Sequence, residues 1–161
     1  MPTPQQLEAQ LWQTIESDRT VMLGMVGADA GHTRPMTAQI ENGHGPIWFF
    51  TTTDTALVEN LRPGAKAYIS VVSKGHDIWA SIHGTLALAN DPAVVDRLWN
   101  GSVAAWYEGG KSDPKLALLR FDASEAEIWE DGSSILAGVK ALFGIDPKKD
   151  YQDKTAKVAL H

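Results

Sequence analysis

Apolar residues recur at helical spacing near the start of the chain and in strand-like runs after it. Leu7, Leu11 and Ile15 are four positions apart, and residues 3–17 are therefore predicted to form an amphipathic helix. The next run, 20–27, is apolar on both faces and predicts a buried strand. A turn is predicted directly after it, at residues 28–31.

The alternation of residues 32–41 predicts a strand with a single charge on its apolar face. One face has Arg34, Met36, Ala38 and Ile40, and the other has Pro35, Thr37 and Gln39. Pro35 lacks an amide hydrogen, which favours an edge position. Arg34 must extend its guanidinium to water or meet an anion. The spacing alone leaves both roles open.

The remaining pattern predicts many strands joined by short turns. Strands are expected at 47–51, 66–72, 77–88, 116–122 and 126–131, and short helices at 52–64, 90–100 and 132–144. A hairpin loop is expected at 42–46, an irregular segment at 101–115 and a polar tail at the end. Thr53 or Asp54 is expected to cap one helix, and Asp91 another with Pro92 at its first position. We expect one domain, 1–161, that is mainly β and antiparallel, a barrel or sandwich with flanking helices.

Net charge and composition limit the kinds of partner that the protein is expected to bind. The chain has 161 residues and a formal net charge of −6, which argues against a general nucleic-acid or membrane-surface binder. No apolar run is long enough to span a membrane, and the N-terminus shows no secretion pattern. We therefore expect a cytoplasmic protein.

The sequence contains none of the common catalytic motifs. It has no cysteine, which excludes disulfides, thiolate catalysis and cysteine-ligated metals. The five histidines show no zinc-binding spacing, and no phosphate loop or nucleophile elbow is present. We predict no metal site and can name no catalytic residue. Any redox chemistry would require a bound cofactor.

One local pattern is typical of a phosphate site. In "FFTTTDT" a strand end meets a helix start, and Thr51, Thr52, Thr53 and Thr55 supply hydroxyls. A plain helix cap explains the same residues. Arg34 on a nearby strand favours the phosphate.

Four motifs in fixed order then indicate a family. "RPMTAQI", "GPIWFFTTTDTALVENL", "SIHGTL" and "AEIW" resemble the general stress proteins of the pyridoxamine 5′-phosphate oxidase-like superfamily, and the similarity runs from about residue 7 to about residue 144. The resemblance implies an FMN-binding split β-barrel. It also implies a homodimer with the flavin at the subunit interface.

The resemblance assigns site residues position by position. Arg34 would meet the phosphate, and the ring and ribityl chain would lie along Pro35, Met36, Thr37, Ala38 and Gln39. The strand end and loop hydroxyl correspond to Phe49, Phe50, Thr51 and Thr55, and Trp79 and Ser81 would lie near the flavin. Trp129 would approach the ring from the other subunit.

Two departures from the family pattern shape the functional prediction. Ala56 and Leu57 stand where many members have basic residues that neutralise the phosphate, so Lys74 is the expected substitute. The same change is expected to loosen the selectivity of the site, so that FAD could also bind. The basic substrate element that follows the tryptophan in the oxidases is missing after Trp129, so vitamin B6 oxidation is not expected.

The resulting prediction is a flavin-binding stress protein, with FMN as cofactor and FAD as a second candidate. A weak flavin-dependent oxidoreductase is one form, in which His76 or His83 would handle protons. The alternative is a non-enzymatic flavin carrier or a stress-linked interaction protein. Haem-handling and deazaflavin-dependent relatives of the same barrel are further possibilities.

Overall fold

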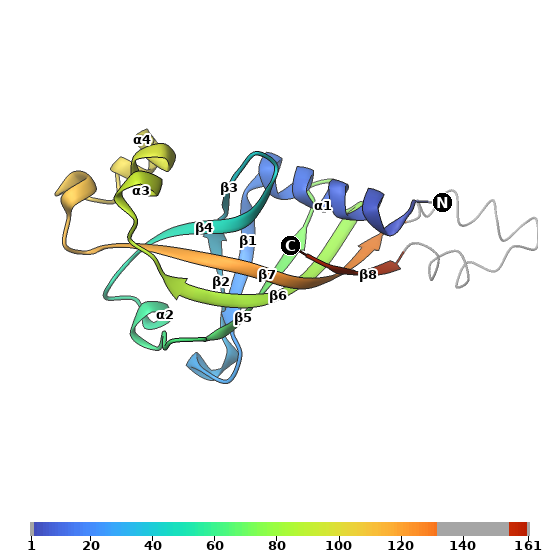
Figure 1. The fold of residues 1–161 in the computed structure, drawn as a ribbon, viewed down its shortest axis with the longest axis horizontal. Coiled ribbons are helices and arrows are strands. Elements are labelled where there is room, and N and C mark those ends of the chain that lie inside the picture. The colour runs from blue at the N-terminus through green and yellow to red at the C-terminus, as the bar shows by residue number, and fades with distance from the viewer. Residues whose placement is uncertain (1, 132–154, 161) are drawn as a thin grey trace, which may run out of the picture.

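A single curled antiparallel sheet organises the part of the chain described by the computed structural model, residues 2–131 and 155–160 (Figure 1). Its strands are β1 (Thr20–Met25), β2 (Thr33–Thr37), β3 (Gln39–Glu41), β4 (His44–Thr52), β5 (Lys66–Val72), β6 (Ile78–Leu88), β7 (Leu116–Glu130) and β8 (Thr155–Ala159). The helices are α1 (Pro4–Asp18), α2 (Ala56–Glu59), α3 (Pro92–Leu98) and α4 (Gly101–Ala104), with 3-10 turns η1 (Asp29–Gly31) and η2 (Gly110–Ser112). The mainly β, antiparallel prediction is confirmed.

The strand order is β2-β1-β5-β6-β7-β4-β3, and β8 pairs with β7. β2 ends this order, which confirms the edge position predicted for Pro35. β6 and β7 run along the long axis, and α3, α4 and η2 gather at one end of them (Figure 1). That the whole chain, 1–161, forms one domain stays a prediction.

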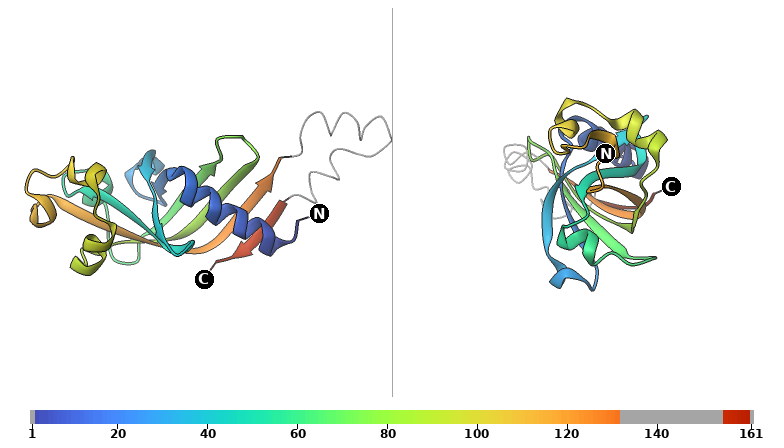
Figure 2. Two further views of the ribbon diagram at one scale, coloured as in Figure 1. Left: turned by 90° about the horizontal axis from the view of Figure 1, so that it is seen from above. Right: turned by 90° about the vertical axis from the view of Figure 1, so that its left-hand side faces the viewer.

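Helix α1 closes one side of the sheet. Thr3 and Gln6 form a reciprocal capping box, and Pro4 occupies the first turn. The helix lies across the sheet (Figure 2) and buries Leu7, Leu11, Trp12 and Ile15. It ends at Arg19, whose φ of 65° is left-handed. The amphipathic prediction is confirmed.

β1 is buried on one face and partly exposed on the other, so the prediction of a buried strand holds fully for one face only. Val21 and Leu23 lie in the core, whereas Met22 between them is 38% exposed. Residues 20–27 are apolar on both sides because the sheet face turned away from α1 is itself partly apolar. We call this face, to which Met22 of β1 belongs, the outer face.

Residues 32–41 form two strands instead of one. The strand is interrupted at Ala38, whose amide donates to the carbonyl oxygen of Arg19 at 2.6 Å. The period-two assignment therefore fails beyond Thr37, and Gln39 is buried instead of sharing the exposed face of Pro35 and Thr37. Alternation cannot reveal such a break because both halves are extended.

The turns follow local sequence chemistry. Asn42 and Gly43, with φ of 58° and 72°, connect β3 to β4, as the hairpin prediction requires. Helix α2 is capped by Thr55, so neither Thr53 nor Asp54 is the cap, and it ends well before Pro63.

Helix α3 confirms the predicted cap and first position, because the side chain of Asp91 accepts from the amide of Ala93 and Pro92 begins the helix. The segment expected to be irregular, 101–115, contains the short helix α4 and the turn η2.

The two last predicted strands are one continuous strand, β7. It pairs with β6 along its length, with β4 over Leu116–Phe121 and with β8 over Glu125–Trp129. A register shift between His83 and Gly84 separates the two halves. The polar tail includes β8, which the pattern did not predict, and the helix expected at 132–144 lies outside the described residues.

Gly84 makes the register shift possible. A Cβ on this residue would lie 2.2 Å from the carbonyl oxygen of Asp122, so only glycine fits. On the facing strand the hydroxyl of Ser124 donates to the carbonyl oxygen of His83 at 2.9 Å. This bulge bends both long strands and helps to curl the sheet.

Candidate functional site

A pocket lies where four separate segments of the chain meet. It has a volume of about 1000 Å³ and is lined by residues from 18–20, 35–39, 50–55 and 100–107. The segments come from the α1–β1 junction, from β2 and β3, from the end of β4 up to α2, and from the region of α4. Two of them, 35–39 and 50–55, contain the motifs that the sequence analysis singled out.

Seven of the predicted site residues line this pocket. They are Pro35, Met36, Thr37, Gln39, Phe50, Thr51 and Thr55. The pocket joins a sheet edge to a strand end because β2 leads through Ala38 into β3, which pairs with β4. Residues distant in sequence are thus brought to one concave surface.

The threonine side of the pocket is ordered by its own hydrogen bonds. The hydroxyl of Thr55 donates to the carbonyl oxygen of Thr52 at 3.0 Å and accepts from the amide of Val58 at 3.4 Å. The hydroxyl of Thr52 donates to Asp54 at 2.6 Å. This hydrogen bond lowers the pKa of the Asp54 carboxyl. The loop is therefore polar and held in place.

An aromatic cluster supports the part of the pocket that residues 100–107 form. The rings of Phe50, Trp99 and Tyr107 lie within 5.9–6.4 Å of one another, centre to centre. Tyr107 donates its hydroxyl hydrogen bond to the carbonyl oxygen of Thr51 at 2.5 Å. Burial raises the pKa of Tyr107 to about 12. The cluster fixes residues 100–107 against the end of β4.

Arg19 is the single cation among the residues that line the pocket, and Asp18 is the single carboxylate. Arg19 stands at the left-handed end of α1, and its side chain is exposed. The sequence analysis missed it. Only the fold places the end of α1 beside β2 and β4, so no local pattern could have identified it.

Arg34 is directed elsewhere. Its guanidinium pairs with the carboxylate of Asp29, and it is absent from the residues lining the pocket, although Pro35 beside it is included. Of the two roles that the alternation left open, Arg34 therefore meets an anion, and this anion belongs to the turn before its own strand. Its assignment to a phosphate stays a prediction.

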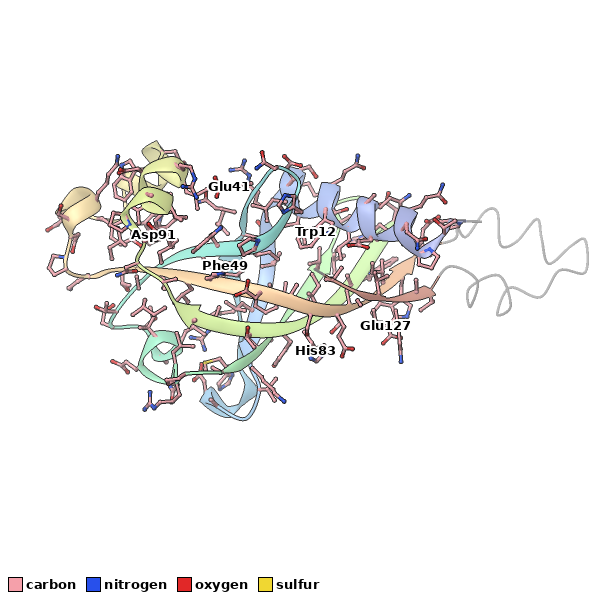
Figure 3. All side chains as sticks on the ribbon, viewed as in Figure 1. Trp12, Glu41, Phe49, His83, Asp91 and Glu127 are labelled. Carbon is pink, nitrogen blue, oxygen red and sulfur yellow. The ribbon has the colours of Figure 1, made fainter. Side chains whose placement is uncertain are left out.

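Three further predicted residues lie on the outer face. Trp79 pairs with Trp129 in the β6–β7 register, and Ser81 lies two positions along β6. Trp79 also lies opposite Val72 of β5 and stacks against the ring of His76 at 6.3 Å. Figure 3 shows His83 and Glu127 projecting from the same two strands, away from α1. None of these residues lines the pocket of their own chain.

The last four predicted residues do not face the pocket either. Ala38, Phe49 and Leu57 are buried in the core. Lys74 lines a second cleft of about 740 Å³ between α1 and the β5–β6 turn, where its ammonium group is 3.9 Å from Asp18. Its predicted role toward a phosphate remains untested.

The sequence analysis also missed the wall that residues 100–107 contribute. Its pocket-lining members, called the α4 wall below, are Asn100, Gly101, Ser102, Val103, Trp106 and Tyr107. The segment had been predicted only as irregular. Its two adjacent aromatic residues, Trp106 and Tyr107, are 80% and 5% exposed, a difference that only the fold reveals.

Among the residues that the structure describes, no group of three or more histidine, cysteine, aspartate or glutamate side chains could hold a metal ion. No described helix combines the length and apolar character needed to cross a membrane.

Comparison with known proteins places this pocket in context. The chain superposes with a TM-score of 0.79 on a protein assigned to the general stress family of Xanthomonas campestris pv. campestris, which is 59% identical over 83% of this chain and 93% of that one. The general stress FMN/FAD binding protein of Xanthomonas citri is 57% identical, with coverages of 81% and 92% and a TM-score of 0.76. Protein bli-3 of Neurospora crassa is 26% identical over 91 residues, which span 52% of this chain and 44% of that protein.

A family model covers nearly the whole chain. The model described as pyridoxamine 5′-phosphate oxidase like matches residues 6–151. The two Xanthomonas structures share the curled antiparallel sheet of this chain, which confirms the split-barrel prediction. The chain therefore belongs to the pyridoxamine 5′-phosphate oxidase-like family, and its relatives are general stress proteins.

Proposed function

We propose that the pocket of about 1000 Å³ binds a flavin nucleotide, with FMN as the main cofactor and FAD as a second ligand. The observation that supports this most strongly is the meeting of two motifs at one pocket: Pro35, Met36, Thr37 and Gln39 from the first, and Phe50, Thr51 and Thr55 from the second. The similar protein from Xanthomonas citri, which binds FMN/FAD, supports the same ligand class.

The phosphate would lie at the threonine side. Thr51, Thr52 and Thr55 have hydroxyls there, and Arg19 supplies a positive charge. The hydroxyls of Thr52 and Thr55 donate to Asp54 and to the Thr52 carbonyl oxygen, so a phosphate would have to replace these acceptors. Arg34 could add a second positive charge if it left Asp29. Ala56 and Leu57 offer no charge, so these few charge-assisted hydrogen bonds, worth about 1.5–3 kcal/mol each, would decide the affinity.

A homodimer would complete the site. Trp79, Ser81 and Trp129 share the outer face with Met22 and Val72, which are 38% and 44% exposed. A second copy seated on this face would cover apolar surface. It would also bring the two tryptophans toward a flavin held in its partner's pocket.

The residues that line the pocket are better suited to holding a flavin in position than to acid–base catalysis. No histidine lines it, and Asp18 is its single carboxylate. A bound flavin would supply the redox chemistry itself. We therefore propose a weak flavin-dependent oxidoreductase of the stress-response type, not a vitamin B6 oxidase, with a flavin carrier as the alternative. A cytoplasmic location stays a prediction.

Titration of the ligand-stripped protein with FMN, FAD and riboflavin, followed by flavin fluorescence, tests the proposal. FMN should bind at least about ten-fold more tightly than riboflavin, because only FMN has the phosphate. Equal affinities would contradict the phosphate assignment, and no binding at all would overturn the function. Bleaching of bound flavin by NAD(P)H would separate an oxidoreductase from a carrier.

The dimer needs its own test. Val72→Asp places a charge on the outer face, and light scattering should then show a monomer with weakened FMN binding. Leu88→Asp, at a position 50% exposed near the far end of β6, is the matched control. A Val72→Asp protein that remains dimeric and binds FMN normally would exclude this interface.

A further inference from the structure

The α4 wall has one feature that FMN binding does not explain. Trp106 is 80% exposed at the rim of the pocket. Burial of a tryptophan releases a large apolar surface from water, so an indole left this open is unusual unless something covers it. An exposed indole face is also a surface on which a nucleobase stacks, at about 1–3 kcal/mol per base.

Trp106 stands on a rigid support. Its amide donates to the carbonyl oxygen of Val103 at 3.1 Å, and the amide of Val103 donates in turn to the Asn100 side chain at 3.0 Å. The next residue, Tyr107, is tied to the Thr51 carbonyl oxygen at 2.5 Å. The backbone that presents Trp106 is therefore fixed relative to the end of β4 before any ligand arrives.

The hydrogen bond between Tyr107 and Thr51 connects the segment that carries Trp106 to the proposed phosphate subsite. The proposed phosphate subsite is at Thr51, Thr52 and Thr55, and Tyr107 fastens the α4 wall to the first of them. A ligand that continues beyond its first phosphate would thus extend toward the α4 wall. The volume of about 1000 Å³ is at the upper end of the roughly 300–1,000 Å³ typical of ligand pockets, which leaves room for the extension.

We propose that Trp106 and the α4 wall form a nucleobase subsite, which holds the adenine of FAD by stacking on the indole. The proposal rests on the proposed flavin site for the position of the phosphate. It adds the residue that would distinguish FAD from FMN, because FMN ends at its phosphate and has no adenine to stack on the indole. The polar side of the subsite is the exposed Ser102, which can hydrogen-bond to the base or its ribose.

Affinities of the wild-type protein and three variants for the two flavins provide the first test. Trp106→Ala should weaken FAD binding by at least about ten-fold, the loss of one stacked base, and change FMN binding less than about two-fold. Trp106→Phe keeps an aromatic face and should retain most of the FAD affinity. Leu88→Ala, an exposed apolar residue outside the pocket, should leave both unchanged.

AMP alone provides a readout that needs no flavin. It should quench the tryptophan fluorescence of the wild-type protein and leave that of Trp106→Phe unaffected. If neither flavin binds but AMP quenches Trp106, the subsite stands and the proposed flavin function fails. If FMN binds and Trp106→Ala leaves FAD affinity unchanged, the function stands and the subsite is overturned. Equal loss of both flavins, or conversion of a dimer to a monomer by Trp106→Ala, also overturns the subsite.

Discussion

Arg34 forms an ion pair with Asp29, five positions earlier in the chain. Both side chains are largely shielded, with 25% and 15% exposed. A phosphate in the pocket would have to draw Arg34 away from this partner. The ion pair therefore sets part of the cost of binding a phosphate through Arg34.

Arg34→Ala should lower FMN affinity by about ten-fold or more and leave riboflavin affinity unchanged, because only FMN has a phosphate. Asp29→Asn should have the opposite effect, since it releases Arg34 for the ligand. Parallel fluorescence titrations measure both. Unchanged FMN affinity in Arg34→Ala would show that the arginine serves only its ion pair.

Arg19→Asn should weaken FMN binding by roughly ten-fold without loss of stability. Asparagine tolerates the left-handed backbone at φ 65°, so the substitution removes the charge and keeps the end of α1. Riboflavin affinity and the melting temperature serve as internal controls. Arg62→Asn, which removes an exposed arginine outside the pocket, should change neither flavin's affinity.

Gly84→Ala should destabilise the protein by at least about 2 kcal/mol. The new Cβ would lie 2.2 Å from the Asp122 carbonyl oxygen, a backbone atom that cannot move without breaking the β6–β7 register. Gly101→Ala is the matched control, because a Cβ there meets nothing within 4 Å. Denaturant unfolding of the two variants compares them, and equal stabilities would contradict the bulge argument.

Tyr107→Phe should cost about 1–2 kcal/mol of unfolding free energy, because the carbonyl oxygen of Thr51 loses its donor. The change is small in volume, so the aromatic cluster should persist. Near-ultraviolet circular dichroism of the folded variant can verify that the cluster remains. Thermal unfolding that matches the wild type would indicate that this hydrogen bond contributes little.

The same tyrosine predicts a pH dependence at alkaline pH. Its pKa rises from 10.0 to about 12 on folding, so the folded state holds the proton more tightly than the unfolded state. The resulting stabilisation is complete below pH 10 and is lost as the pH rises toward about 12. The stability difference between wild type and Tyr107→Phe should therefore shrink over that interval. A constant difference would contradict burial of the hydroxyl.

The sequence predicted most of the strands because their periodicity is local. The 66–72 strand matches β5, and the α3 cap at Asp91 was found from Pro92 beside it. The break at Ala38 was missed, since it depends on a hydrogen bond to Arg19, which is distant in sequence. β8 was missed because it is short and follows a polar stretch of sequence, so its apolar residues, Ala156 and Val158, alternate over only five positions.

The candidate site was predicted in part for a similar reason. Thr51 and Thr55 were found because a strand end and a helix cap adjoin in sequence. Arg19 and Trp106 enter the pocket only through tertiary packing, so no motif could reveal them. Arg34 was predicted to meet an anion, but alternation cannot specify which anion a side chain will choose.

The pairing of β8 with the second half of β7 has a consequence for the solution behaviour of the chain. β4 covers the edge of β7 only at Leu116–Phe121, and β8 covers the same edge at Glu125–Trp129. A chain that ended before Thr155 would leave the second stretch with unsatisfied amide and carbonyl groups, beside the apolar outer face. Such an open strand edge is a template for pairing with other chains. The pairing of Thr155–Ala159 thus keeps this edge of β7 from pairing with the strands of other chains.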